Sequence, residues 1–190
     1  SHTSKNDKFT QTYVLVNGWQ KINMVTGYSI PALGMQFLYK PNSKWVLNYS
    51  NFLGSMRPDS TWSPRFYNDF YATYAINDKW SILTNVDIAM DKNSQDDKGV
   101  WYGANLRFRY LPNSKHALCL RTEFINDPQQ VLFTQFNQNW NVWGASLNWD
   151  LRLNSFVLLR SEIKYMESNS TIFRPNQSAN LNALVALQVK

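Results

Sequence analysis

Apolar and polar residues alternate one by one along two neighbouring segments near the middle of the chain. Residues 102–110 place alternate side chains on an apolar face, and residues 116–125 repeat this pattern after a turn at 111–115. A period of two is that of a β-strand, because successive side chains of a strand point to opposite faces. Each arm is about ten residues long, roughly the length of a tilted strand that crosses a bilayer and about twice that of a strand in a soluble domain. The pattern predicts a membrane-spanning β-hairpin.

The same short turn, centred on an asparagine, returns along the whole chain. The turns are spaced roughly 35 to 41 residues apart, which indicates an internal repeat of one long hairpin. Their central residues are Asn6, Asn42, Asn77, Asn113 and Asn154. Longer polar connections lie between them, at 23–29, 54–64, 91–99, 126–138 and 167–178. Short turns that alternate with long loops are typical of outer-membrane barrels, whose periplasmic turns are short and whose outer loops are long.

These turns and loops define ten predicted strands within a single domain, residues 1–190. The strands are 9–22, 30–39, 45–53, 65–75, 80–90, 100–110, 116–125, 140–151, 156–166 and 179–189. An even number of strands, with both termini beside short turns, fits an antiparallel transmembrane β-barrel with periplasmic termini. Within the first strand, Asn17 and Gly18 could instead form a hairpin turn. We interpret this strand as continuous, since a break there leaves two pieces too short to span.

Composition also favours a surface that faces lipid. Charged residues make up 17% of the chain, below the roughly 25% of soluble domains, and aromatic residues make up 15%. No apolar run approaches the roughly 18 residues of a transmembrane helix, so any spanning must use strands. A soluble β-sandwich shows the same alternation, but strand length, unequal turns and aromatic strand ends favour the barrel. The aromatic residues expected at the membrane interfaces are Tyr39, Trp45, Trp80, Trp101, Tyr110, Trp140 and Tyr165.

Charged residues gather on the polar face of the predicted strands. The pattern Arg-x-Glu occurs at 121–123 and at 160–162, and a spacing of two places both charges of each pair on one face. An outward Arg or Lys near the bilayer midplane would cost about 2 to 4 kcal/mol, so this face must point into the lumen. The predicted pore-lining residues are Asp87, Arg107, Arg109, Arg121, Glu123, Asp150, Arg160, Glu162 and Lys164.

Two interpretations of this charged wall stay open. Rows of opposite charge can create a transverse field that orients solutes and sets weak ion selectivity. The same charges can also form a lattice of ion pairs that only stiffens the wall of the barrel.

Little in the sequence supports catalysis or a cofactor. The two histidines, His2 and His116, have no companion serine, aspartate or second histidine at a recognisable spacing. The single cysteine, Cys119, excludes an intrachain disulfide and a cysteine-based metal site. The net charge of +6 is spread out, without the basic stripe of a nucleic-acid-binding protein. We expect a protein that is not an enzyme and that has no metal, cofactor or nucleic-acid partner.

Six segments in a fixed order cover nearly the whole chain and carry a family resemblance. They are 13–20 (YVLVNGWQ), 38–42 (LYKPN), 77–80 (NDKW), 101–103 (WYG), 120–124 (LRTEF) followed by Asp127, and 158–162 (LLRSE). In this order they resemble the OmpL-like β-barrel porin family of Gram-negative outer membranes. The resemblance implies an outer-membrane barrel without catalytic residues. Its best matches for pore-lining charge are Arg121, Glu123, Arg160 and Glu162.

Two features depart from that family. Its members are usually longer and resemble this chain mainly in their C-terminal portion, so the ten strands could be the last part of a larger barrel. Outer-membrane barrels tend to end on an aromatic residue, whereas this chain ends on Val189 and Lys190. The chain opens on a polar segment, 1–8, without the apolar stretch of a signal peptide, so we expect a mature protein or a fragment.

The sequence therefore predicts an outer-membrane channel for passive diffusion of small hydrophilic solutes or ions. Outer-membrane lipid and these solutes are its expected partners, and a homo-oligomer or a larger envelope complex stays open. The alternative is a non-conducting barrel that serves as a structural or docking subunit, because an eight-stranded barrel is filled by side chains and ten strands leave little more room. A membrane-embedded hydrolase is disfavoured, since no nucleophile and base stand together in the sequence.

Overall fold

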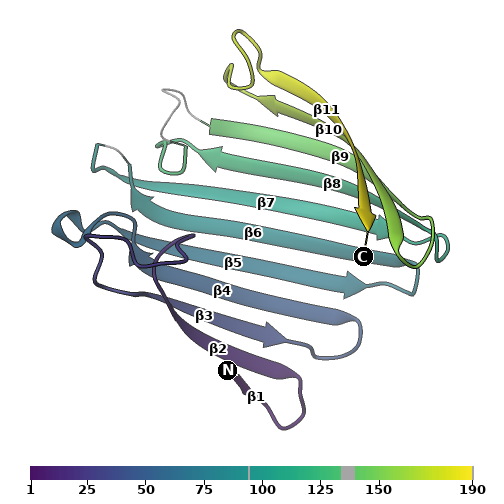
Figure 1. The fold of residues 1–190 in the computed structure, drawn as a ribbon, viewed down its shortest axis with the longest axis horizontal. Coiled ribbons are helices and arrows are strands. Elements are labelled where there is room, and N and C mark those ends of the chain that lie inside the picture. The colour runs from purple at the N-terminus through teal and green to yellow at the C-terminus, as the bar shows by residue number, and fades with distance from the viewer. Residues whose placement is uncertain (94, 134–139, 190) are drawn as a thin grey trace.

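The computed structural model describes residues 1–93, 95–133 and 140–189, and its strands form one antiparallel sheet in chain order (Figure 1). The strands are β1 (His2–Thr3), β2 (Phe9–Val16), β3 (Ala32–Tyr39), β4 (Trp45–Ser55), β5 (Pro64–Ala75), β6 (Trp80–Lys92), β7 (Lys98–Tyr110), β8 (His116–Asp127), β9 (Trp140–Arg152), β10 (Val157–Ser168) and β11 (Ala179–Val189). A short 3₁₀ helix, η1 (Asp59–Thr61), lies between β4 and β5. Within the described residues, no helix is long and apolar enough to cross a membrane.

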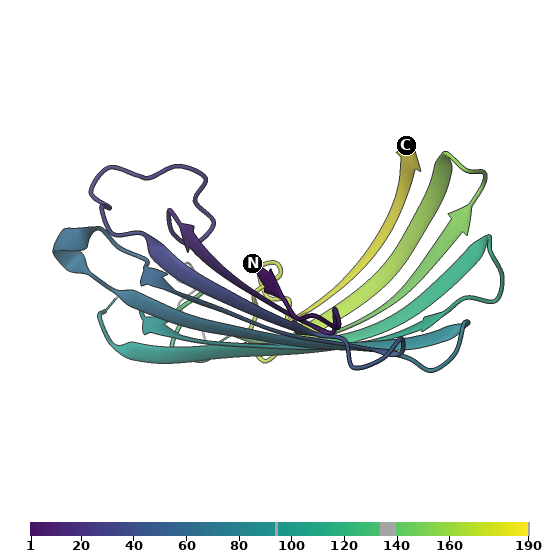
Figure 2. The ribbon, with the colours of Figure 1, turned by 90° about the horizontal axis from the view of Figure 1, so that it is seen from below.

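The sheet curves into a trough with a concave and a convex face (Figure 2). Its edge strands are β1 and β11, which are not paired with each other among the described residues. The short turns lie at one end of the trough and the longer connections at the other (Figure 1). The predicted alternation of short turns and long loops therefore places all the short turns at one end of the sheet and the long loops at the other.

The asparagine turns share one set of hydrogen bonds. The side-chain oxygen of Asn113 accepts from the backbone N–H groups of Lys115 and His116, at 2.9 and 3.0 Å. Equivalent pairs of bonds occur at Asn42, Asn77 and Asn154. An asparagine side chain can close a turn in this way because it mimics a backbone acceptor. The repeated hairpin turn predicted from the spacing is thus confirmed.

Large apolar side chains cover the convex face of the sheet. The register places Val86 of β6 opposite Phe70 of β5 and opposite Ala104 of β7. The same row continues through Phe124 of β8 to Trp143 of β9. Phe70, Val86 and Trp143 are between 45% and 60% exposed, so no other layer of the described residues covers them. Exposed apolar rows of this kind are typical of a surface that contacts lipid.

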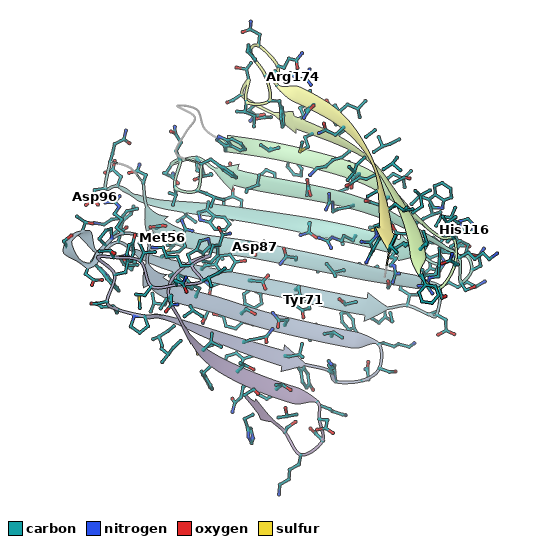
Figure 3. All side chains as sticks on the ribbon, in the orientation of Figure 1. Met56, Tyr71, Asp87, Asp96, His116 and Arg174 are labelled. Carbon is teal, nitrogen blue, oxygen red and sulfur yellow. The ribbon has the colours of Figure 1, made fainter. Side chains whose placement is uncertain are left out.

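A belt of aromatic pairs lies on the convex face near the short turns. Trp45 stacks on Tyr74 with ring centroids 4.4 Å apart, and Trp80 stacks on Tyr110 at 4.2 Å. His116 lies parallel to Trp149, whose indole N–H donates to Nδ1 of His116 at 3.1 Å. Figure 3 shows His116 at this end of the sheet, opposite the end that carries Asp96. These pairs match the aromatic girdle of a membrane barrel. The prediction was wrong for Trp101, which is buried on the other face of the sheet against Ala89 and Val131.

The structure corrects two predictions about strands. The first long strand ends at Val16 rather than at residue 22, because Asn17 turns the chain by donating to the carbonyl of Ile22 at 2.7 Å. Gly18 and Gln20 take positive φ angles of 133° and 54°, which no strand accommodates. In the part of the chain that the structure describes, the short β1 brings the number of strands to eleven rather than ten, and a two-residue strand leaves no alternation to detect. Residues 94 and 134–138 of the predicted loops, and Lys190, lie outside the described residues.

Candidate functional site

The predicted charged residues share the concave face of the sheet. The loop at 17–31 lies on the concave side (Figure 2), and its Trp19 packs on Phe52 and Tyr67, with ring centroids 5.2 and 4.8 Å apart. Side chains alternate between the two faces along each strand, and the register shows which residues of neighbouring strands share a face. The concave face can therefore be followed from Phe52 of β4 and Tyr67 of β5 across the sheet to β10. The residues placed there are Asp87, Arg107, Arg109, Arg121, Glu123, Asp150, Arg160, Glu162 and Lys164. Their role in lining a pore stays a prediction.

A network of ion pairs joins β8 to β10 over the intervening β9. The guanidinium of Arg121 contacts Glu123 at 3.3 Å and Glu162 at 3.0 Å, and Lys164 pairs with Glu123. Arginine and glutamate side chains are long enough to meet across one intervening strand, and curvature toward the concave face shortens the gap between them. Because these side chains are about one quarter exposed, each pair contributes modestly to stability. The network holds these four charged side chains in fixed orientations on the concave face.

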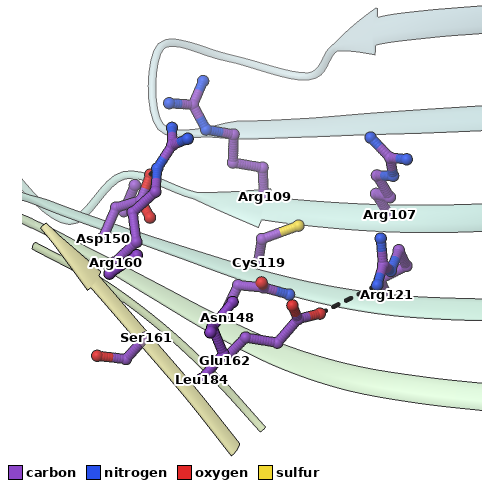
Figure 4. Close-up of a pocket in the computed structure, with 12 residues that line it drawn as sticks. Arg107, Arg109, Cys119, Arg121, Asn148, Asp150, Arg160, Ser161, Glu162 and Leu184 are labelled. Atoms are coloured by element: carbon purple, nitrogen blue, oxygen red, sulfur yellow. Dashed lines mark hydrogen bonds and ion pairs between the residues drawn. The ribbon is translucent and has the colours of Figure 1, made fainter. Parts of the chain in front are cut away.

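Beside this network lies a cavity of about 350 Å³ that is rich in arginine (Figure 4). It is lined by Arg107 and Arg109 of β7, Cys119 and Arg121 of β8, and residues of β9, β10 and β11. Arg160 pairs with Asp150 at 3.3 Å. Arg107 and Arg109 have no carboxylate within ion-pair distance among the described residues. This part of the wall is therefore basic.

The wall formed by β5 and β6 is acidic and aromatic. Asp69 and Asp87 are directly opposite each other in the register. Tyr67 donates to Asp87, and Asn85 donates to Asp69. Asp69 and Tyr67 were not predicted from the sequence, although a spacing of two places them on one face of the strand with Arg65 and Tyr71. Aromatic residues on both faces of β5 obscured that signal.

A buried ion pair lies between β5 and β6 near the long loops. The guanidinium of Arg65 contacts Oδ2 of Asp91 through Nε at 2.8 Å and through Nη2 at 2.7 Å. The two side chains are 5% and 3% exposed. Trp19 covers Arg65, with its ring centroid 5.1 Å from the guanidinium carbon. The loop after β2 thus seals charged groups against the wall.

A second loop folds onto the concave face after β8. The carboxylate of Asp127, which is fully buried, accepts hydrogen bonds from the backbone N–H groups of Val131, Leu132 and Phe133, at 2.8, 2.8 and 3.0 Å. Val131 packs in one cluster with Ala89 and Trp101. Both loops therefore narrow the trough at the end opposite the short turns.

Replacing Asp127 by alanine is expected to release residues 128–133 from the wall. The folded protein should then be cleaved by chymotrypsin after Leu132 and Phe133 about tenfold faster or more, because three hydrogen bonds are lost. Cleavage is followed by mass spectrometry of the protein in vesicles. Asp59→Ala is the control, since Asp59 holds the other loop through Ser29. Equal cleavage of the parent and Asp127→Ala proteins would contradict the assignment.

The loops between β4 and β5 and between β6 and β7 are joined by the ion pair of Arg57 with Asp96 and by a hydrogen bond from Arg57 to the carbonyl of Asn93. Asp96 contacts Lys92 at 2.8 Å and Arg57 at 2.9 Å. The hydrogen bond from Lys92, supported by Arg57, lowers the pKa of the Asp96 carboxyl from its ordinary value. Asp96 therefore keeps its negative charge to lower pH than an unpaired aspartate would. No group of metal-ligating side chains occurs in the described part of the chain.

A curved antiparallel sheet with an apolar, aromatic-belted convex face and a charged concave face defines a porin-like outer-membrane β-barrel. The chain belongs to the family described as "Putative beta-barrel porin-2, OmpL-like", whose model matches residues 1–189. This confirms the resemblance predicted from the sequence. Membership identifies the protein as a porin-like outer-membrane β-barrel.

A solved structure supports the same fold. The NanC porin, determined in a rhombohedral crystal form, is similar with a TM-score of 0.57 and 12% sequence identity. The match covers 96% of this chain and 92% of that chain. At this identity the likeness shows the fold alone. Comparison with curated proteins finds no match.

Proposed function

We propose that the concave face is the wall of an aqueous path along which small hydrophilic solutes and ions diffuse through the outer membrane. The separation of charge on this face carries the proposal. Asp69 and Asp87 lie on β5 and β6, whereas Arg107 and Arg109 lie on β7. Fixed charges of opposite sign on neighbouring parts of a wall create a field across the path and orient solutes. The proposal includes no catalytic step.

The membrane requires the sheet to be closed. Most of β11 is exposed, and one of its edges has no paired strand among the described residues. An open edge does not persist in hydrocarbon, because each unpaired backbone group there costs several kcal/mol. The proposed working form is therefore a closed barrel. In it the short turns and both termini lie in the periplasm and the long loops face outward, as in bacterial barrels of this kind.

Neutralising two arginines of the wall should change ion selectivity. In the double variant Arg121→Gln and Arg160→Gln, the reversal potential across a planar bilayer with a salt gradient is expected to shift toward that of a cation-selective channel, because positive charge has been removed from the path. The control variant Lys40→Gln and Lys115→Gln removes the same charge from exposed short turns. Unchanged reversal potentials in the arginine variant would count against the lining.

The second candidate is a non-conducting barrel that serves as a structural or docking subunit. The packing of Trp19 and Val131 on the concave face favours it, because both loops fill part of the trough. Single-channel recording separates the two candidates. Discrete conductance steps from the purified protein support the path. Silence from folded protein, together with a copurifying partner that is lost when the loop at 126–138 is shortened, supports the docking subunit.

A further inference from the structure

We propose that the arginine-lined cavity is a binding subsite for small solutes that carry an oxyanion group, such as a carboxylate or a phosphate. The inference rests on the proposed function, since it names the class of solute that would pause on the path. The cavity has a volume of about 350 Å³, which is at the lower end of the roughly 300 to 1,000 Å³ of ligand pockets. The subsite therefore suits a small acid.

The balance of charge around the cavity favours an anion. Four arginines line it, namely Arg107, Arg109, Arg121 and Arg160, against two carboxylates, Asp150 and Glu162. Both carboxylates are already paired, Glu162 with Arg121 and Asp150 with Arg160. Arg107 and Arg109 have no such partner among the described residues. Two guanidinium groups thus remain available to a ligand.

The register places two of these positive charges directly against each other. Arg107 of β7 is opposite Arg121 of β8. Like charges at directly opposite positions of an antiparallel pair destabilise it. Glu123 and Glu162 offset only the charge of Arg121. An anion bound beside Arg107 would relieve the remaining repulsion.

Hydrogen bonding gives a second, independent indication. Nε of Arg107 is buried and has no hydrogen-bond partner among the described residues. A buried polar group without a partner is costly, and such groups are normally satisfied. The planar guanidinium fork fits the two oxygens of a carboxylate or phosphate. In Figure 4, the guanidinium groups of Arg107 and Arg109 extend to the same side of the sheet as the thiol of Cys119.

Cys119 offers a direct probe of the subsite, because it lines the same cavity and is the only cysteine of the chain. We would measure the rates at which its thiol reacts with two methanethiosulfonates of similar size, one with a sulfonate and one with a trimethylammonium group. The folded protein in vesicles is compared with the variant Arg107→Gln and Arg109→Gln. In the variant, the reaction rate of the anionic reagent divided by that of the cationic reagent is expected to fall at least about tenfold.

Competition by an anion tests binding itself. Inorganic phosphate should slow the reaction of the sulfonate reagent along a saturating curve, while chloride at equal ionic strength should not. If the labelling rate of Cys119 recovers when phosphate is washed out, the site binds a dissolved anion. If labelling instead stays slow and the slowing depends on added anionic lipid, a lipid headgroup occupies the site, and the assignment to solutes is overturned. Lys40→Gln with Lys115→Gln is the charge control and should behave like the parent.

Three results would overturn the proposal. They are an equal ratio of rates in the parent and the arginine variant, no competition by phosphate beyond that of chloride, and a thiol that is inert to a neutral reagent of the same size. Where the double variant fails to fold, Arg109→Gln alone serves, because the Arg109 side chain is exposed. Conductance is recorded in parallel. A protein that shows no conductance but labels selectively and saturably at Cys119 would refute the channel and support the subsite. A protein that conducts but labels without charge selectivity would support the channel and refute the subsite.

Discussion

Replacing Asp91 by asparagine is expected to lower the free energy of unfolding by about 3 to 5 kcal/mol, because it leaves the guanidinium of Arg65 buried without its counter-charge. Arg65 reaches Oδ2 of Asp91 through two nitrogens, and both side chains are almost fully buried. Asp91 also accepts from the backbone N–H of Lys92 at 2.7 Å and from the hydroxyl of Ser63 at 3.4 Å. Guanidinium chloride titration in phospholipid vesicles, followed by tryptophan fluorescence, measures the change.

The matched control is Asp150→Asn, which removes the partner of Arg160. That arginine is 56% exposed, so water replaces the lost interaction and the expected cost is below about 1 kcal/mol. Replacing both buried partners, Arg65 by methionine and Asp91 by leucine, should recover much of the loss, since no unpaired charge remains. Equal, small losses for Asp91→Asn and Asp150→Asn would show that water reaches Arg65.

Local pattern was sufficient to predict most of the long strands and the shared face of the charged residues that were named. A strand has a side-chain period of two, so once one residue of a strand is assigned, every other residue of it is assigned as well. Asn42, Asn77, Asn113 and Asn154 marked the turns because each closes its own turn with its own side chain. These properties depend on neighbours within a few positions, and a sequence displays them directly.

Contacts that depend on curvature or on loops could not be predicted in this way. Arg121 meets Glu162 across β9, and alternation along one strand carries no information about which residues of other strands lie within reach. Trp19 was assigned to a strand, yet it packs on Phe52 and Tyr67, more than thirty positions away in the chain. The buried pair of Arg65 and Asp91 is likewise formed between two strands and covered by a third segment. The sequence predicted the wall well and the loops that narrow it poorly.

The second large effect on stability is expected from placing a charge on the convex face, which contacts lipid. Replacing Val86 by arginine is expected to cost about 2 to 4 kcal/mol of stability in vesicles, because the convex face contacts hydrocarbon near its middle. Val86 is 45% exposed and lies in the apolar row between Phe70 and Ala104. The folded fraction, measured by heat-dependent electrophoretic mobility, and the urea midpoint report the loss.

The neighbouring residue provides the control at the same depth of the sheet. Asn85 lies on the concave face, where its side chain donates to Asp69 and accepts from Asn105. An arginine there would stand beside the carboxylates of Asp69 and Asp87, so Asn85→Arg should fold nearly as well as the parent. If the convex face met water, Val86→Arg would be harmless. If the concave face were the packed core of a soluble sandwich, Asn85→Arg would be the more damaging change. The order of the two variants therefore decides which face meets lipid.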